Sequence, residues 1–277
     1  MFAYAFMQKA LLAGLLVGLL CSLVSFFVVL KRLSFIGAGI SHSAFGGVAL
    51  GIWLGINPLL SAAVFSTLIA WAIGLVSRKG HINEDVTIGI FFSSTMALGV
   101  AIIGLIKGYV ADVYTFLFGN ILAVTATDLW WLGGCGLLVG LVLIILHKEF
   151  LFLCFDEEMA RASGLPTGPL YYILLTAIAL TIVVSVKVVG VVLASALLVI
   201  PAATGYELSK NYRGMLLISL LTGVVSAIGG LWLSFQYNLA SGATIVLVSA
   251  VIFFLALLLS PRRCGFWRFR HRHPPAN

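Results

Sequence analysis

Charge is scarce in this sequence. Only 9% of its 277 residues are Asp, Glu, Lys or Arg and 62% are hydrophobic, whereas soluble globular proteins carry about 25% charged residues. So few charges cannot cover a water-facing surface, which excludes a soluble enzyme and a disordered chain. The cysteines have no paired spacing, which excludes a disulfide framework; they are Cys21, Cys135, Cys154 and Cys264.

Catalytic and nucleotide-binding motifs are also missing. The chain has no GxxxxGK[ST] phosphate loop, so we do not expect it to hydrolyse ATP itself. HExxH, GxSxG and paired intramembrane carboxylates are absent as well, which argues against an enzyme and against a permanently bound cofactor. The net charge is +7, but the basic residues lie between apolar runs, so nucleic acid is not an expected partner.

Long apolar runs fill the chain instead. A membrane helix needs about 20 apolar residues, and nine runs approach that length: 10–30, 34–56, 58–77, 86–106, 129–146, 169–186, 188–205, 214–235 and 241–260. The seventh contains Gly190 and Pro201, so we expect it to be kinked or only partly spanning, which would leave eight full spans. The predicted fold is an all-α integral membrane protein, a polytopic helix bundle over residues 1–262. The basic tail 263–277 is predicted to be disordered.

The basic residues predict an orientation. If the N-terminus lies outside, the loops after the odd-numbered spans contain every Lys and Arg except Lys9, Lys107 and Lys187. Cytoplasmic loops of membrane proteins carry such an excess of basic residues. The pattern therefore predicts nine spans and a cytoplasmic C-terminus.

The external segment 108–128 has an apolar middle. Its stretch TFLFGNILAV is too short to span a membrane and too apolar for a free loop, so we predict a re-entrant or interfacial helix. Two acids of this segment, Asp112 and Asp128, either attract cations at an entrance or are ordinary solvated charges.

One histidine falls inside a predicted span. His42 follows Arg32 by ten residues, which is about 15 Å of helix, so it is expected near the bilayer midplane. Ionisable residues inside membranes are candidates for function, and imidazole binds divalent transition metals. The alternative is a neutral histidine that hydrogen-bonds to a neighbouring helix.

Small residues recur every four positions in the same segment. This spacing lets another helix approach closely, so we predict tight helix packing beside His42 and a position that faces protein or a pathway. The residues are Gly39, Ser43, Gly47, Gly51 and Gly55, and a similar series on the first span is Ala10, Gly14, Gly18 and Ser22.

The cytoplasmic segment 148–168 has the signals of a short helix. Asp156 suits an N-cap, the two glutamates after it suit the first turn, and Arg161 suits the last turn. Gly164 and Pro166 end the helix. Such a helix is either a plain connector or a coupling helix that docks into a soluble motor subunit.

Several blocks in this order resemble the membrane permease subunits of manganese, zinc and iron ABC importers. The blocks are FMQKALLAGLLVGLLCSLV at 6–24, KRLSFIGAGISHSAFGGVALG at 31–51, FLFGNIL at 116–122, FDEEMARASGL at 155–165, VKVVGVVLASALLVIPAAT at 186–204 and SGATIVLVSAVIFFLALLLSP at 241–261. Together they cover nearly the whole chain, which makes the resemblance more specific than any single motif.

The resemblance implies a subunit of an importer in the bacterial cytoplasmic membrane. Its partners would be a second permease protomer, identical or related, a cytoplasmic ABC ATPase and an extracytoplasmic metal-binding protein. ATP-driven alternating access would move a divalent ion inward. FDEEMARASGL matches the family's coupling helix, and its candidate ATPase-coupling residues are Phe155, Asp156, Glu157, Glu158, Met159, Ala160, Arg161 and Gly164.

The family's metal-path motif is only partly present. The motif reads G-D-x-x-x-H, and residues 37–42 read GAGISH, so His42 matches while Ala38 stands in place of the aspartate. Two protomers would then offer two imidazoles and no carboxylate, which favours zinc over manganese, although water, serine hydroxyls or a different partner permease could supply ligands.

Other functions stay open at this point. An ABC permease for a larger chelate or a vitamin needs no midplane histidine. A secondary ion transporter would need intramembrane acids, which are absent at midplane depth. The small-residue series alone would also permit a non-transporting membrane scaffold.

Overall fold

The structure, a computed structural model, describes residues 5–80, 82–106, 119 and 121–260. All regular structure in these residues is helical, which confirms the all-α prediction. The elements are α1 (Ala5–Leu30), α2 (Ile36–Leu54), α3 (Pro58–Gly80), α4 (Glu84–Leu105), η1 (Ile121–Ala123), α6 (Ala126–Ile145), α7 (His147–Phe155), α8 (Glu157–Ala162), α9 (Thr167–Val189), α10 (Val191–Leu197), α11 (Ile200–Leu208), α12 (Tyr212–Tyr237) and α13 (Ser241–Leu258).

Nine segments of the described chain are long and apolar enough to cross a membrane, as predicted. The seventh of them, Val191–Leu208, is broken into α10 and α11 at Leu198 and Val199. Pro201 occupies the first turn of α11, where its missing N–H needs no partner. The expected kink is therefore a helix break.

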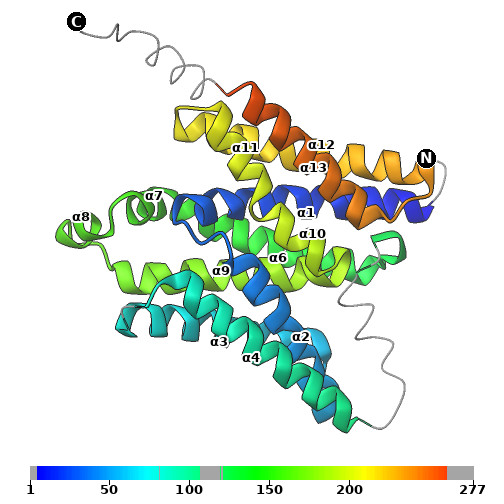
Figure 1. Cartoon of the computed structure of the whole chain (residues 1–277), viewed down its shortest axis with the longest axis horizontal. Helices are drawn as coiled ribbons and strands as arrows, with labels where there is room; N and C mark the ends of the chain where they lie inside the picture. Colours follow the sequence, from blue (N-terminus) through cyan, green and yellow to red (C-terminus); the bar gives the residue numbers. More distant parts are fainter. Residues whose placement is uncertain (1–4, 81, 107–118, 120, 261–277) are drawn as a thin grey trace, which may run out of the picture.

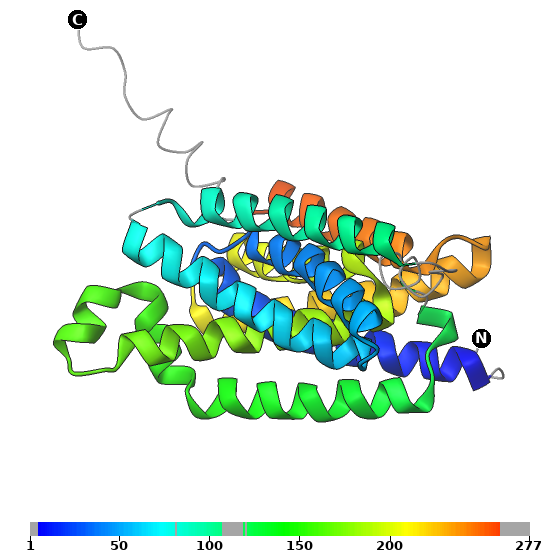
Figure 2. The ribbon, with the colours of Figure 1, turned by 90° about the horizontal axis from the view of Figure 1, so that it is seen from below.

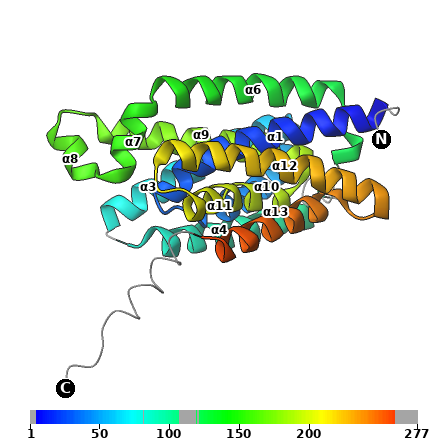
Figure 3. The same cartoon turned by 90° about the horizontal axis from the view of Figure 1, so that it is seen from above.

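Two central helices join two groups of outer ones. In Figure 1, α1 and α9 cross the middle of the molecule, with α2, α3 and α4 on one side and α11, α12 and α13 on the other. α1 packs against α12 and α9, and α9 packs against α3 and α2. α6 runs along the outer edge in Figures 2 and 3. Accordingly, 72% of the α9 span is buried but only 17% of the α6 span.

The small residues of α1 lie against α12. A Cβ atom added to Gly18 would lie 2.9 Å from the carbonyl oxygen of Gly223, and one added to Gly223 would collide with the Ser22 hydroxyl. The Ser219 hydroxyl donates to the Ser22 carbonyl across the same interface, at 3.0 Å. Glycine is required at both positions because the two backbones touch.

The predicted re-entrant segment is described only in part. Residues 107–118 and 120, which include Asp112, lie outside the described residues, and so does the tail 263–277. The described part contains the single turn η1, whose buried Ile121 lies against Gly14 of α1. Asp128 belongs to the first turn of α6, where its carboxylate and Thr125 form a capping box. It also pairs with Lys187 at 2.6 Å, so Asp128 is neither a free entrance charge nor a solvated one.

Candidate functional site

The candidate path residue His42 lies in α2, which begins after a tight turn. Arg32 has a positive φ of 62°, and Leu33 N–H donates to the Val28 carbonyl, which separates α1 from α2. α2 therefore starts at Ile36 and not at Arg32, so His42 lies about 9 Å along the helix. The expected 15 Å counted the ten residues from Arg32 as one unbroken helix, and the position of His42 near the bilayer midplane stays a prediction.

Small residues of α2 contact two neighbouring helices. A Cβ atom added to Gly47 would lie 2.7 Å from the Cα atom of Ala62 in α3, and one added to Gly51 would lie 2.9 Å from the Cα atom of Pro58. A Cβ atom on Gly39 would lie 2.6 Å from Ile88 Cγ2 in α4. These glycines allow α3 and α4 to approach the α2 backbone directly.

The other two members of the series differ from each other. The Ser43 hydroxyl is buried and lies 2.9 Å from the Thr95 hydroxyl of α4, so it joins the same contact surface. Gly55 does not, because it follows the last residue of α2 as a left-handed C-cap with φ of 68° and no atom within 4 Å of an added Cβ. Its place in the four-residue spacing does not make it a packing residue, and its role is to end the helix.

The His42 ring is held in one orientation by its own helix. Nδ1 lies 2.9 Å from the carbonyl oxygen of Ala38. A carbonyl oxygen only accepts, so Nδ1 donates this hydrogen bond and Nε2 is the ring nitrogen left to bind another group. The ring is partly exposed and contacts the Phe92 ring edge-to-face, with centroids 4.5 Å apart. Metal-binding histidines are commonly fixed by such a hydrogen bond from the second nitrogen to a backbone carbonyl.

The described residues of this chain do not assemble a complete metal site of the usual kind. Within the described residues, no three His, Cys, Asp or Glu side chains come close enough to hold an ion together. Ala38 has no carboxylate to offer, although its backbone carbonyl orients His42. Any further ligands must come from outside this set.

The second candidate region, the coupling segment, contains one helix more than predicted. The amphipathic helix α7 precedes α8, with Phe150 and Leu153 buried on its inner face. Their spacing of three residues was the signal that could have revealed it. Asp156 caps α8 as expected, since its carboxylate accepts from Met159 N–H at 2.9 Å. Gly164 ends the turn with φ of 84°.

Two large apolar side chains around the start of α8 point outward. Phe155 is 66% exposed and Met159 is 60% exposed, whereas Ala160 is fully buried. Glu158 and Arg161 are exposed too. The segment therefore presents an apolar and charged surface at one end of the bundle, where Figure 1 shows α8 extending from the helices.

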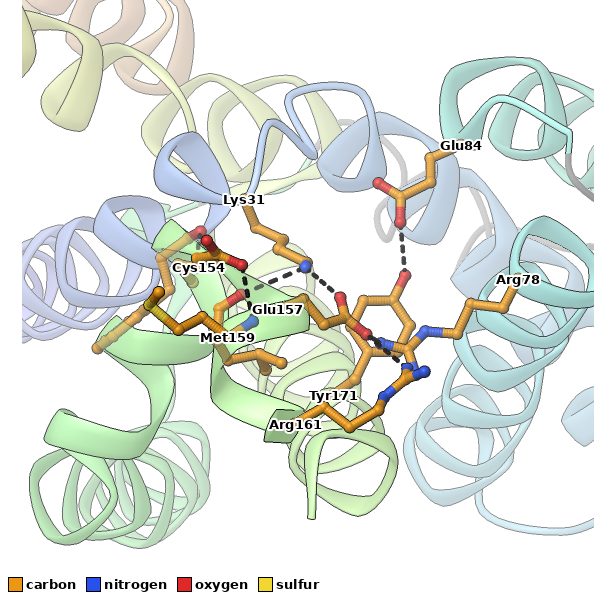
Figure 4. A network of polar contacts seen from close by, with 11 residues as sticks. Lys31, Arg78, Glu84, Cys154, Glu157, Met159, Arg161 and Tyr171 are labelled. Carbon is orange, nitrogen blue, oxygen red and sulfur yellow. Dashed lines mark hydrogen bonds and ion pairs between the residues drawn. The ribbon is translucent and has the colours of Figure 1, made fainter. Parts of the chain in front are cut away.

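Glu157 is the exception, because it points inward and binds three cations (Figure 4). Its carboxylate lies 2.6 Å from Lys31 Nζ and makes a close ion pair with the Arg78 guanidinium. Arg161, one turn further along α8, lies 3.8 Å away. We call Glu157, Lys31, Arg78 and Arg161 the Glu157 cluster.

Tyr171 extends the Glu157 cluster to α9 and α4. The Arg78 guanidinium lies over the Tyr171 ring, 4.0 Å from its centroid, and the Tyr171 hydroxyl donates to Glu84 at 3.0 Å. Sequence reasoning missed these contacts, because it used Lys31 and Arg78 only as evidence of orientation. Nothing in the spacing of residues so far apart in the chain predicts that they meet.

Cys154 lies beside the Glu157 cluster without joining it (Figure 4). Burial raises the pKa of its thiol to about 12, and the nearby Lys31 lowers that pKa only in part. The thiol is therefore neutral at physiological pH and adds no charge to the cluster.

The model of the ABC 3 transport family matches residues 3–260 of the sequence. The chain belongs to this family. The membership confirms the resemblance found in the sequence and gives the multi-pass bundle a transport role.

Named relatives cover almost the full length of this permease. The manganese transport system membrane protein MntC of Halalkalibacterium halodurans is 38% identical over 96% of this chain and 92% of its own. The chelated iron transport system membrane protein YfeD of Yersinia pestis is 36% identical over 93% of this chain and 86% of its own. The structure of PsaBC from Streptococcus pneumoniae in complex with Fab matches with a TM-score of 0.83, 35% identity and 93% coverage of both chains.

Proposed function

We propose that this permease carries divalent transition metal ions inward as part of an ABC importer in the bacterial cytoplasmic membrane. The observation that carries the proposal is His42 in span α2, whose Nδ1 donates to the Ala38 carbonyl and so leaves Nε2 as the nitrogen for binding an ion. Manganese and iron are the first candidates, because the similar proteins are named for manganese and for chelated iron. Zinc stays a prediction from the two-imidazole chemistry and has no support in those names.

The ion would pass between two permease copies. Each copy contributes one His42 imidazole, and water or the partner permease completes the coordination shell, since Ala38 supplies no carboxylate. A site with few protein ligands binds an ion less tightly, which suits transit better than storage. The Ala38 substitution should therefore lower affinity without closing the path.

The motor and the delivery protein would bind at opposite ends. The distribution of basic residues supports a cytoplasmic α8 and C-terminal tail 263–277 and an external N-terminus, with 1–262 as one permease domain. A separate ABC ATPase would contact the exposed Phe155 and Met159, and an extracytoplasmic metal-binding protein would dock at the other end. ATP-driven closure would then switch the permease pair between outward and inward access.

The test uses the assembled transporter reconstituted in vesicles. ATP hydrolysis is titrated with binding protein loaded with manganese, iron or zinc, and with the empty binding protein as control. We expect hydrolysis to rise with manganese or iron and to require the ATPase subunit. The proposed function would be contradicted if empty binding protein stimulated ATP hydrolysis equally, or if none of the three metal-loaded forms stimulated it.

A further inference from the structure

The Glu157 cluster is the polar connection between α8 and the rest of the bundle. Asp156 caps its own helix, Arg161 pairs within α8, and the Ser163 hydroxyl donates to a carbonyl of the same turn. In the described part of the chain, Glu157 is the α8 side chain that forms ion pairs with residues outside α8. A displacement of α8 can therefore act on Lys31 and Arg78 through this carboxylate, in addition to its packing against α7 and α9.

Lys31 connects Glu157 to the start of α2. It lies in the turn between α1 and α2, and its ammonium group also donates to the Leu153 carbonyl of α7 at 3.4 Å. Its side chain is only 14% exposed, so water screens the pair less than at an open surface. His42 comes six residues after α2 begins, so the turn that Lys31 anchors leads directly into the first turns of the His42 helix.

Arg78 provides a second route to the same helix. It lies in the last turn of α3, and α3 touches the α2 backbone at Gly47 and Gly51. Because both α2 residues are glycines, no flexible side chain of α2 lies in these contacts to absorb a movement of α3. Close-packed backbones transmit displacements because they deform little. The two partners of Glu157 outside α8 thus lead to α2: Lys31 through the turn before its start and Arg78 through the α3 contacts along its length.

From this geometry we propose that Glu157, through Lys31 and Arg78, is the positioning residue that couples movement of α8 to movement of α2 and His42. The inference rests on the proposed function and specifies how the motor acts on the ion path. Removing the Glu157 charge should leave α8 able to bind its motor, but α8 would move without carrying α2. ATP would be hydrolysed with little ion movement.

The experiment compares variants in the full transporter with ATPase and manganese-loaded binding protein in vesicles. Manganese uptake and ATP hydrolysis are measured together for Glu157→Gln, Arg78→Gln and the double variant. The matched controls are Asp85→Asn for Glu157→Gln and Lys79→Gln for Arg78→Gln, because each removes the same charge. Both residues are exposed at the same end of the bundle, and neither forms an ion pair within the described chain. Copurification of the ATPase subunit checks assembly.

We expect Glu157→Gln to keep the bound ATPase and its hydrolysis, while ions moved per ATP fall roughly tenfold, within the range of coupling between sites. The double variant should lose no more than the worse single variant, since both changes remove one connection. The inference would be overturned if Glu157→Gln transported manganese with an unchanged number of ions per ATP. It would also be overturned if the control variants showed an equal fall, or if Glu157→Gln lost the ATPase subunit. If the wild-type complex takes up no metal with ATP, the proposed function itself fails.

Discussion

α2 and α6 are both glycine-rich apolar spans, but they are held in different ways. In α2, Gly47 and Gly51 lie four residues apart and both touch the backbone of α3. In α6, Gly136 and Gly140 have the same spacing, yet an added Cβ would only reach side chains of α1 at 3.5–4.0 Å. The difference teaches that a four-residue spacing gives a helix the capacity for close packing, while its neighbours decide whether that capacity is used.

Polar contacts hold α6 at its start, whereas backbone packing holds α2 along its length. α6 is fixed at its start by the Thr125 capping box and by the pair between Asp128 and Lys187. α2 instead has no side-chain cap at its start and is held along its buried face. The helix that carries His42 is thus held by close backbone contacts along its length, whereas the polar contacts of α6 lie at its start.

Replacing His42 should have the largest effect on transport. His42→Ala removes the imidazole from α2. Loss of a residue that only hydrogen-bonds to a metal ligand costs roughly 10–100-fold in affinity or activity, so we expect ATP-driven manganese uptake to fall by at least as much. The matched control, Cys135→Ala, truncates a half-buried residue of α6 and should leave uptake unchanged. Uptake is measured in vesicles after assembly is checked by copurification. Normal uptake by His42→Ala would make the histidine a structural residue only.

Glycine substitutions test the packing side of the comparison. Gly47→Ala should destabilise the protein by about 1–3 kcal/mol, because the added methyl overpacks the contact with Ala62. Gly134→Ala in α6 meets nothing within 4 Å and should stabilise it by up to about 1 kcal/mol. Thermal unfolding in detergent measures both. Equal effects of the two changes would remove the distinction between the helices.

The end contacts of α6 should give the smallest change. Asp128→Ala removes the capping box and the Lys187 pair, and we expect a loss of about 1 kcal/mol in the same unfolding assay. Lys187→Met removes only the pair and should cost less, since partly exposed ion pairs contribute about 0–1 kcal/mol. If Lys187→Met cost more than Asp128→Ala, the cap would not be what fixes α6.

The sequence predicted the features that depend on composition and local spacing. Apolar length located the nine spans, and Pro201 marked the break in the seventh. The acid at 156 and the glycine at 164 located the ends of α8. These signals are local, so a single chain displays them without knowledge of the fold.

Features that depend on distant partners could not be predicted. Lys31, Arg78 and Glu157 are far apart in the chain, and their meeting depends on how α1, α3 and α8 pack. The start of α2 at Ile36 could not be predicted, because the positive φ of Arg32, a conformation unusual outside glycine, is not visible in the sequence. Gly55 fitted the packing series by spacing alone and instead ends its helix.

Manganese uptake by the reconstituted complex tests the central claim most directly. Vesicles contain the permease, the ATPase subunit and external manganese-loaded binding protein, with ATP supplied on the ATPase side. The account predicts accumulation that requires ATP and stops when either partner is omitted. Full uptake by this polypeptide alone, without nucleotide, would contradict it.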